Sequence, residues 1–281
     1  GAIPNLRRLI SAGVMLRHGS ITNFPSITWP SHNAIGTGSW SGHHDIVNPS
    51  YYLRESRETV SPQGQQFDTA RFLNPGVETL FEAFHRVYGE WDGASGVVTA
   101  SVNEPCTRGA GHASLERRLI GDRGELIMLT KETEHEISPR WFNELEEQGH
   151  RLQGQIDNRA LAQARQLLLD RSHPAPIFTY HEFAQPDSSA HDYGPHHEGA
   201  RAALDETDVR IGHLLRTLEG RGLFESTLFV ITTDHGMAQQ DVSLKANPAR
   251  IPQRDGMEAV TPEPLVYLRA IEVATAARAD G

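Results

Sequence analysis

Short apolar segments alternate with amphipathic helical segments along this chain, and this alternation constrains the fold more than any other feature. The apolar segments have the length of β-strands and lie at 96–100, 177–180 and 227–231. The helical segments carry apolar residues on one face and lie at 4–12, 77–87, 159–170 and 198–219. Strands that alternate with helices predict right-handed crossovers and a mostly parallel central sheet with helices on both faces. We therefore predict an α/β fold.

Local signals place the ends and the buried faces of these helices. Pro4 suits the first turn of the first helix, and Asn158 suits the N-cap of the third helix. In the second helix, the side chains of Leu80, Phe81 and Phe84 are expected on the buried face. Each helix thereby gains one face that can cover the sheet.

Two polar runs come directly after two of the predicted strands. Residues 185–195 follow the strand at 177–180, and residues 232–237 follow the strand at 227–231. Ligands of open parallel α/β folds gather outside the carboxyl ends of the strands. We therefore expect the two runs to meet at one edge of the sheet.

The two runs contain side chains of the kinds that bind zinc-type divalent ions. Asp187 and His191 lie four positions apart, and Asp234 and His235 are adjacent. Carboxylate oxygen and imidazole nitrogen suit an ion that keeps a coordination position open for substrate. Taken singly, each pair also fits a turn former or a surface polar pair. His181, within the preceding strand, is more simply a packed histidine.

A third run, Ile-Thr-Trp-Pro-Ser-His at 27–32, supplies a candidate nucleophile in Thr28. A threonine hydroxyl is nearly inert at neutral pH, so Thr28 needs either a neighbouring base or a metal ion that favours the alkoxide. By itself the run also fits an ordinary extended segment, because the residue before a proline is pushed away from the helical region. Thr28 is a candidate nucleophile only in combination with the acidic and histidine runs.

Composition and charge restrict the class of partner. The chain has 281 residues, 38% of them hydrophobic and 22% charged, which suffices for one large domain. A formal net charge of -10 argues against a nucleic-acid binding surface, although a metal pocket still admits one phosphate, so the expected partner is a small phosphorylated molecule. The single cysteine, Cys106, excludes an internal disulfide. No apolar run approaches the roughly 18 to 20 residues that a membrane span needs, whereas oligomeric state and compartment stay open.

We predict one catalytic domain over residues 1–281 with an inserted cap region at about 101–157. In that region the hydrophobic period weakens into charged, irregular sequence. A cap of this kind is the expected place where the leaving group of the substrate is selected.

In order and spacing, these runs resemble the type I phosphodiesterase and nucleotide pyrophosphatase branch of the alkaline phosphatase superfamily. The matching stretches extend across nearly the whole chain and lie at 4–9, 28–32, 37–38, 44–48, 186–195 and 234–237. The resemblance implies an alkaline phosphatase-like fold and hydrolysis of phosphodiester or pyrophosphate bonds through a covalent phosphothreonine intermediate. It also implies two divalent metal ions, with zinc as the expected element, and a substrate such as a nucleotide.

The same resemblance implies a role for each candidate residue. Thr28 would be the nucleophile and also a ligand of one zinc ion, which Asp234 and His235 would share. Asp187 and His191 would hold the second zinc ion. Two such cations would stabilise the attacking and the leaving oxygens of an in-line displacement at phosphorus.

Asn48 falls near the family's phosphate-oxygen donor and is the candidate substrate-binding residue. The family pattern also expects a metal-binding Asp upstream and a metal-binding His far downstream, but no Asp or Glu precedes Thr28 and no His follows His235. Each site is then short of one ligand, which weakens metal binding. We interpret the chain as a fragment trimmed at both ends, in preference to a degenerate relative.

Three alternative interpretations differ in the nucleophile or in the metal sites that they assume. Sulfatases need a Cys or Ser that is converted to an aldehyde, and the run Cys-Thr-Arg at 106–108 lacks their pattern. A phosphonoacetate-type hydrolase shares the threonine nucleophile and is the nearest enzymatic alternative. A non-catalytic relative with incomplete metal sites is the third. Smaller departures from the family pattern, at Ser31, Gln185 and Ala190, bear on substrate preference.

Overall fold

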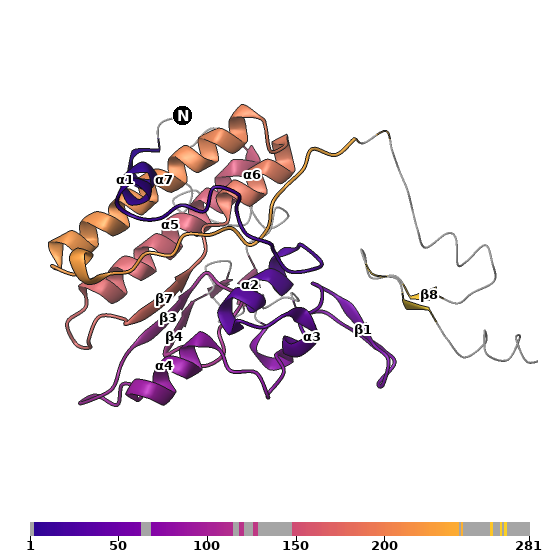
Figure 1. Cartoon of the computed structure of the whole chain (residues 1–281), viewed down its shortest axis with the longest axis horizontal. Helices are drawn as coiled ribbons and strands as arrows, with labels where there is room; N and C mark the ends of the chain where they lie inside the picture. The colour runs from indigo at the N-terminus through magenta and orange to yellow at the C-terminus, as the bar shows by residue number, and fades with distance from the viewer. Residues whose placement is uncertain are drawn as a thin grey trace, which may run out of the picture.

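The computed structural model describes residues 3–62, 69–114, 118–120, 126–128, 148–241, 243, 259–260, 265 and 267–268 (Figure 1). Its α-helices are α1 (Pro4–Ala12), α2 (Thr28–Thr37), α3 (Ser41–His44), α4 (Leu80–Tyr88), α5 (Gln148–Leu169), α6 (Gln185–Tyr193) and α7 (Glu198–Gly220). Short 3-10 helices lie at η1 (Ala70–Phe72) and η4 (Phe224–Ser226). The strands are β1 (Tyr51–Leu53), β2 (Glu58–Val60), β3 (Thr99–Val102), β4 (His112–Ser114), β5 (Arg118–Ile120), β6 (Leu126–Met128), β7 (Phe178–His181), β8 (Ala259–Val260) and β9 (Tyr267–Leu268).

The central sheet has the strand order β4-β3-β7, and both of these pairs are parallel. Ala100 of β3 is in register with His112 of β4 and with Thr179 of β7. The strands predicted at 96–100 and 177–180 correspond to β3 and β7, each displaced toward the carboxyl end. The prediction of a parallel central sheet is confirmed.

Helices cover both faces of this sheet, as Figure 1 shows. On one face, Ala100 and Val102 of β3 form a buried cluster with Ala160 and Ala164 of α5. On the opposite face, the ring of Phe178 in β7 contacts two aromatic rings of α4. Small alanine side chains let α5 approach the strands closely, whereas aromatic rings fill the wider gap under α4. The predicted arrangement of helices on both faces is confirmed.

Helix α1 is fixed by its contact with α7 rather than by a local cap. Ile3, at the N-cap position, makes no capping hydrogen bond. Instead, the buried carboxylate of Asp208 in α7 accepts hydrogen bonds from the backbone N–H groups of Asn5 at 3.2 Å and Leu6 at 2.7 Å. These first-turn donors have no partner inside their own helix, so Asp208 of α7 accepts their hydrogen bonds. Pro4 begins α1 as predicted.

Helix α4 begins at Leu80, later than predicted, because Thr79 is its N-cap and forms a capping box there. The Thr79 hydroxyl accepts from the Glu82 backbone N–H at 3.1 Å, and the Glu82 carboxylate accepts from the Thr79 backbone N–H at 2.8 Å. Phe81 is fully buried, but Leu80 is 38% exposed, so its predicted burial is wrong. Phe81 and the partly buried Phe84, three residues apart, both pack on Phe178, and Leu80 lies beside them.

Helix α5 extends well before the predicted start, and Asn158 lies inside it rather than at its N-cap. The side-chain oxygen of Asn158 accepts a hydrogen bond from Nε of Arg210 at 2.9 Å. The hydrophobic period fails before 159 because the buried face there includes a carboxylate, Asp157, which is 0% exposed. Because the buried face of the first part of the helix includes polar side chains, the hydrophobic pattern did not predict that part.

The segment at 227–231 does not form the predicted strand, and this prediction is wrong. It is extended but pairs with no strand in the described part of the chain. Leu228 is 87% exposed and Val230 is 80% exposed. A β-branched apolar sequence becomes a strand only where a neighbouring strand satisfies its backbone groups, and no described strand pairs with this one.

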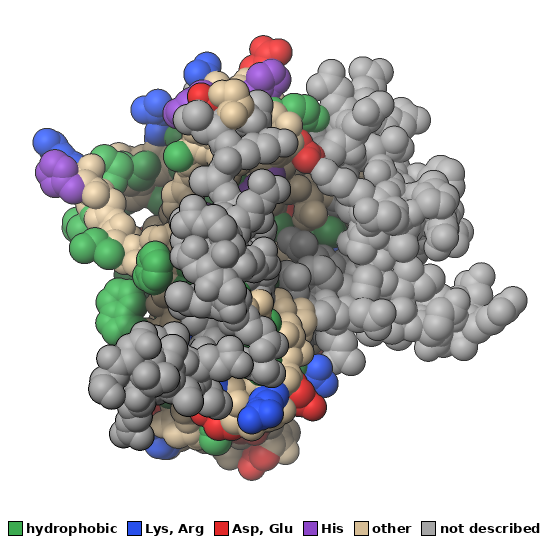
Figure 2. Space-filling model, turned by 90° about the vertical axis from the view of Figure 1, so that its right-hand side faces the viewer, with side chains coloured by type: hydrophobic (Ala, Val, Ile, Leu, Met, Phe, Trp, Pro, Cys, Tyr) green, Lys and Arg blue, Asp and Glu red, His purple; other side chains and the backbone are tan. Residues whose placement is uncertain are grey.

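Large hydrophobic side chains are exposed on this segment and on the chain between α1 and α2. They include Val14 at 93%, Ile21 at 92% and Phe24 at 85%. Figure 2 shows hydrophobic side chains along one edge of the face in view. Among the described helices, none is both long and apolar enough to cross a membrane.

The predicted cap region at about 101–157 begins inside β3 and ends inside α5. Strand β4 and the loop before it also fall in this range and belong to the central sheet or its edge. Most residues between 115 and 147 lie outside the described residues. The inserted cap therefore stays a prediction for that part of the chain.

Candidate active site

Thr28 is the first residue of α2, directly after extended Ile27. Pro30 occupies the first turn, where its missing N–H has no helical partner to lose. The helix ends at Gly38, whose φ of 65° is the left-handed conformation that glycine adopts easily. The Thr28 hydroxyl consequently lies at the amino end of a helix, where the helix dipole favours negative charge on an oxygen.

The side chains of Thr28, Asp234 and His235 converge in the structure. Oγ1 of Thr28 lies 3.4 Å from Nε2 of His235, and Oδ2 of Asp234 lies 3.1 Å from the same nitrogen. The structure therefore brings together three predicted residues from distant parts of the chain. They meet although 227–231 is not a strand, because the Thr22 hydroxyl donates to the Asp234 carbonyl oxygen at 2.5 Å and holds the chain there.

The geometry around His235 suits a cation. Its Nδ1 lies 3.0 Å from the Gly236 carbonyl oxygen, which can only accept, so Nδ1 carries the ring proton. In the neutral ring, Nε2 then presents a lone pair toward the Asp234 carboxylate. Two lone pairs at 3.1 Å repel unless a proton or a metal ion lies between them. The donor set of carboxylate, imidazole and hydroxyl therefore fits a zinc-type ion.

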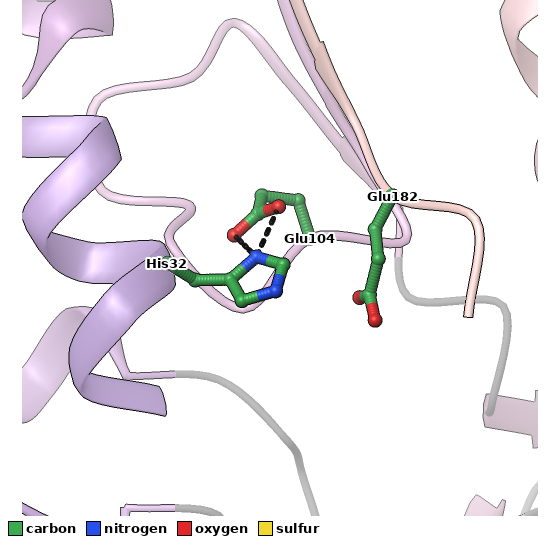
Figure 3. A group of neighbouring side chains, drawn as sticks. All are labelled: His32, Glu104 and Glu182. Carbon is green, nitrogen blue, oxygen red and sulfur yellow. Dashed lines mark hydrogen bonds and ion pairs between the residues drawn. The ribbon is translucent and has the colours of Figure 1, made fainter. Parts of the chain in front are cut away.

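A buried ion pair lies behind Asp234, and sequence reasoning missed half of it. Nδ1 of His32 lies 2.8 Å from both oxygens of Glu104 (Figure 3). Nε2 of His32 lies 3.4 Å from Oδ2 of Asp234. Glu104 is 0% exposed and His32 is 7% exposed. A carboxylate two residues beyond the buried strand β3 was the available signal, since Asp234 also follows a predicted strand.

These charges act on one another through their pKa values. Burial lowers the pKa of His32, but the Glu104 charge and the hydrogen bonds to Asp234 and Glu104 outweigh it and raise that pKa well above its ordinary value. Burial raises the pKa of Asp234, but the hydrogen bond and charge of His32 outweigh it and lower that pKa overall. Asp234 is therefore held as a carboxylate, the form that a metal ligand requires.

Asp187 and His191 lie one turn apart on α6, with Oδ1 of Asp187 3.6 Å from Nε2 of His191. Their side chains are 43% and 67% exposed, so both are open to solvent. Two donors this close suit a shared ion. Among the described residues, however, the group of three potential metal ligands with atoms within 4.8 Å of one another is His32, Glu104 and Glu182. The assignment of Asp187 and His191 to a second ion stays a prediction.

Helix α6 is anchored from below by a network of buried polar side chains. The Asp157 carboxylate accepts from the backbone N–H groups of Ala184 at 2.8 Å and Gln185 at 3.1 Å, and it thereby caps the helix. The Gln185 side chain is 0% exposed, donates to Glu206 at 2.6 Å and accepts from Arg210. Gln185 thus helps to fix the position of α6, which carries the exposed side chains of Asp187 and His191.

Asn48 is buried at 1% exposure, and its side-chain amide donates to the Ser50 carbonyl oxygen at 2.5 Å. Its role as a phosphate-oxygen donor stays a prediction.

An open cavity of about 240 Å³ adjoins Asp234 and is also lined by Thr22, Ser31 and Thr233. Pockets that enclose a whole small ligand measure roughly 300–1,000 Å³. The cavity is therefore too small to enclose a whole small ligand.

Comparison with known proteins identifies the family of this chain. The sequence profile of the family described as type I phosphodiesterase / nucleotide pyrophosphatase matches residues 1–280. The Mus musculus protein bis(5'-adenosyl)-triphosphatase enpp4 is 26% identical over 242 residues, which cover 84% of this chain and 43% of that protein. The Homo sapiens ectonucleotide pyrophosphatase/phosphodiesterase family member 7 is 24% identical over 238 residues, which cover 85% of this chain and 44% of that protein. The chain spans less than half the length of these two relatives.

Among solved structures, murine ectonucleotide pyrophosphatase/phosphodiesterase 5, as an inactive variant in complex with AMP, superposes with a TM-score of 0.66. The match covers 95% of this chain and 60% of that one at 14% identity. At this identity the likeness establishes the fold, and it confirms the predicted alkaline phosphatase-like architecture. The family match across residues 1–280 establishes that this chain belongs to the type I phosphodiesterase / nucleotide pyrophosphatase family.

Proposed function

We propose that this chain carries the reaction centre of a metal-dependent hydrolase that cleaves phosphodiester or pyrophosphate bonds, with Thr28 as the nucleophile. The observation that carries the proposal is the approach of Thr28 Oγ1, Asp234 Oδ2 and His235 Nε2 to within 3.4 Å between neighbours. Membership of a phosphodiesterase and pyrophosphatase family supports the type of bond that is broken.

The geometry favours metal assistance over a metal-free base. In a nucleophile-base-carboxylate triad, the carboxylate bonds one ring nitrogen and the nucleophile faces the other. Here Nε2 of His235 faces both Thr28 and Asp234, while Nδ1 faces the Gly236 carbonyl oxygen. Donors that converge on one point are arranged as ligands of an ion.

The reaction would proceed by two displacements. The Thr28 hydroxyl loses its proton, Oγ1 bonds to phosphorus, and the bond from phosphorus to the leaving oxygen breaks, which gives a phosphothreonine ester. Water then attacks the same phosphorus and releases Thr28. A bound divalent ion would favour the alkoxide of Thr28 and stabilise charge on the phosphoryl oxygens.

A second ion and a phosphate donor complete the proposal. Asp187 and His191 would hold the second divalent ion, with zinc the expected element at both positions, and Asn48 would donate to a phosphate oxygen. The substrate class would be a small nucleotide, since the relatives include a bis(5'-adenosyl)-triphosphatase and a structure in complex with AMP.

The test is hydrolysis of bis-p-nitrophenyl phosphate by the purified protein, before and after chelation and after addition of zinc. We expect chelation to abolish turnover and zinc to restore it. Thr28→Ala should lower kcat by at least roughly 10³-fold, because the nucleophile is removed. Thr28→Ser, which keeps a hydroxyl, is the matched control and should retain measurable activity.

Turnover that survives both chelation and Thr28→Ala would contradict the proposal. Phosphonoacetate and p-nitrophenyl phosphate serve as comparison substrates at the same pH. The proposal requires the highest kcat/KM for the diester, because specificity follows differential stabilisation of the transition state.

A further inference from the structure

The pair formed by His32 and Glu104 lies against Asp234, and nothing in the reaction described above uses it. We propose that Glu104 and His32 act as positioning residues, which hold the Asp234 carboxylate in place and thereby set the metal affinity of the site. This inference rests on the proposed function, because it takes Asp234 to be a metal ligand.

The contacts form a continuous chain from a buried carboxylate to the proposed ligand. Both oxygens of Glu104 lie 2.8 Å from Nδ1 of His32, so this nitrogen carries a proton and donates to Glu104. On the other side of the ring, Nε2 lies 3.4 Å from Oδ2 of Asp234. Figure 3 shows the His32 ring on α2 directed at Glu104, with Glu182 on the far side.

The His32 ring has little freedom to turn. It stacks on the Tyr180 ring with 6.2 Å between centroids, and the Tyr180 hydroxyl donates to the His32 carbonyl oxygen at 3.4 Å. Glu104 is itself fixed, since its Oε1 accepts from the Cys106 backbone N–H at 3.3 Å. Elements β3, β7 and α2 together thus set the direction in which Nε2 points.

Asp234 depends on such contacts more than a residue at the end of a paired strand would. The segment at 227–231 has no strand partner among the described residues, so no sheet ladder fixes the residues that follow it. The described contacts that hold Asp234 include the Thr22 hydroxyl on its carbonyl oxygen. Its carboxylate is contacted by the rings of His32 and His235 and accepts from the backbone N–H of His235. Because Thr22 acts on the backbone, His32 sets the direction of the side chain from outside the metal site.

A separate cation site made of His32, Glu104 and Glu182 is the rival interpretation. Their ligand atoms lie within 4.8 Å of one another. Nδ1 of His32 carries the proton that it donates to Glu104 at 2.8 Å, so this nitrogen has no lone pair to offer an ion. The direct ion pair therefore accounts for the geometry better than a bridging metal does.

The test compares the zinc affinity of the wild-type protein with that of Glu104→Gln, by competition with a chromogenic chelator. Glutamine keeps the shape and can still accept from His32, but the charge that orients the ring is lost. We expect zinc affinity to fall 10–100-fold, as for other partners of metal ligands. At saturating zinc, kcat on bis-p-nitrophenyl phosphate should fall while KM stays the same. His32→Gln, whose amide can still reach Asp234, should lose less affinity than His32→Ala.

Glu82→Gln is the matched control, because Glu82 also forms an ion pair, with Arg108 at 2.9 Å, but on α4. It should lower stability to urea without changing zinc affinity, which separates positioning from a general loss of stability. Unchanged zinc affinity in Glu104→Gln would overturn the inference alone. Loss of an additional bound ion, with the activity-linked ion retained, would overturn it in favour of the rival site. A wild-type protein that neither binds zinc nor hydrolyses the diester would overturn the proposed function and this inference together.

Discussion

At the scale of single residues, the two histidines at the candidate site differ from the histidine on β7 in their neighbours. His32 and His235 lie among carboxylates, whereas His181 on β7 has no hydrogen-bond partner for either ring nitrogen in the described part of the chain. Burial lowers the pKa of His181 to about 4. His181 is therefore neutral in the folded protein, in line with the prediction of a packed strand histidine.

His181 should make the protein sensitive to mild acid. The folded-state pKa of about 4 lies below the unfolded value of roughly 6.5, so the unfolded state alone takes up a proton as the pH falls through this interval. The contribution is fully present above about pH 6.5 and is lost progressively toward pH 4. Urea unfolding at pH 7.5 and pH 5 should show wild type losing about 2 kcal/mol more than His181→Gln. Parallel losses in the two proteins would contradict this assignment.

Sequence patterns predicted the residues of the candidate metal site but not the residues that contact them. Thr28, Asp234 and His235 were predicted from their chemistry and their motif order, and the structure brings them together. Glu104 was missed, because its partner His32 lies on α2 and only the fold shows that they meet. Support by a distant side chain leaves no local spacing to read.

At the scale of elements, the position of α2 depends on a close approach that only glycine permits. A Cβ added to Gly36 would lie 2.6 Å from Sγ of Cys106 and 3.3 Å from its Cβ. Cys106 is 1% exposed and cannot move aside freely. The contact sets how closely α2, with Thr28 at its start, lies against the loop after β3.

Gly36→Ala should therefore destabilise the protein by about 1–3 kcal/mol, the usual cost of overpacking a core. The matched control is Gly42→Ala in α3, where an added Cβ meets nothing within 4 Å. That variant should be neutral or slightly stabilising, because alanine favours helix. Urea unfolding of both variants checks the prediction, and equal stabilities would show that α2 has room to shift.

Elements with a regular apolar face were predictable, and those that depend on polar or absent neighbours were not. The helices at 4–12 and 198–219 were placed almost to the residue. The start of α5 was missed, because Asp157 on its buried face pairs with backbone N–H groups rather than with apolar side chains. The strand at 227–231 failed, because sequence composition cannot supply the partner that a strand requires.

At the scale of the whole molecule, the layered α/β arrangement explains why the candidate residues meet. Thr28 comes from α2 on one face of the sheet, Glu104 follows β3, and Asp234 follows the extended segment after α7 (Figure 1). In a parallel sheet such connections gather at the carboxyl ends of the strands. Applied to the sequence, this general rule predicted only that the runs at 185–195 and 232–237 meet; the meeting of Thr28 with Asp234 and His235 was expected from the family resemblance.

The stereochemical course at phosphorus tests the central claim most directly, because it counts displacements without requiring the intermediate to accumulate. A diester made chiral at phosphorus with sulfur is hydrolysed by the zinc-loaded protein in isotopically labelled water, and the configuration of the product is determined. Attack by Thr28 followed by attack by water comprises two in-line displacements, so the account predicts overall retention. Inversion would mean that water attacks the substrate directly, and it would contradict Thr28 as the nucleophile.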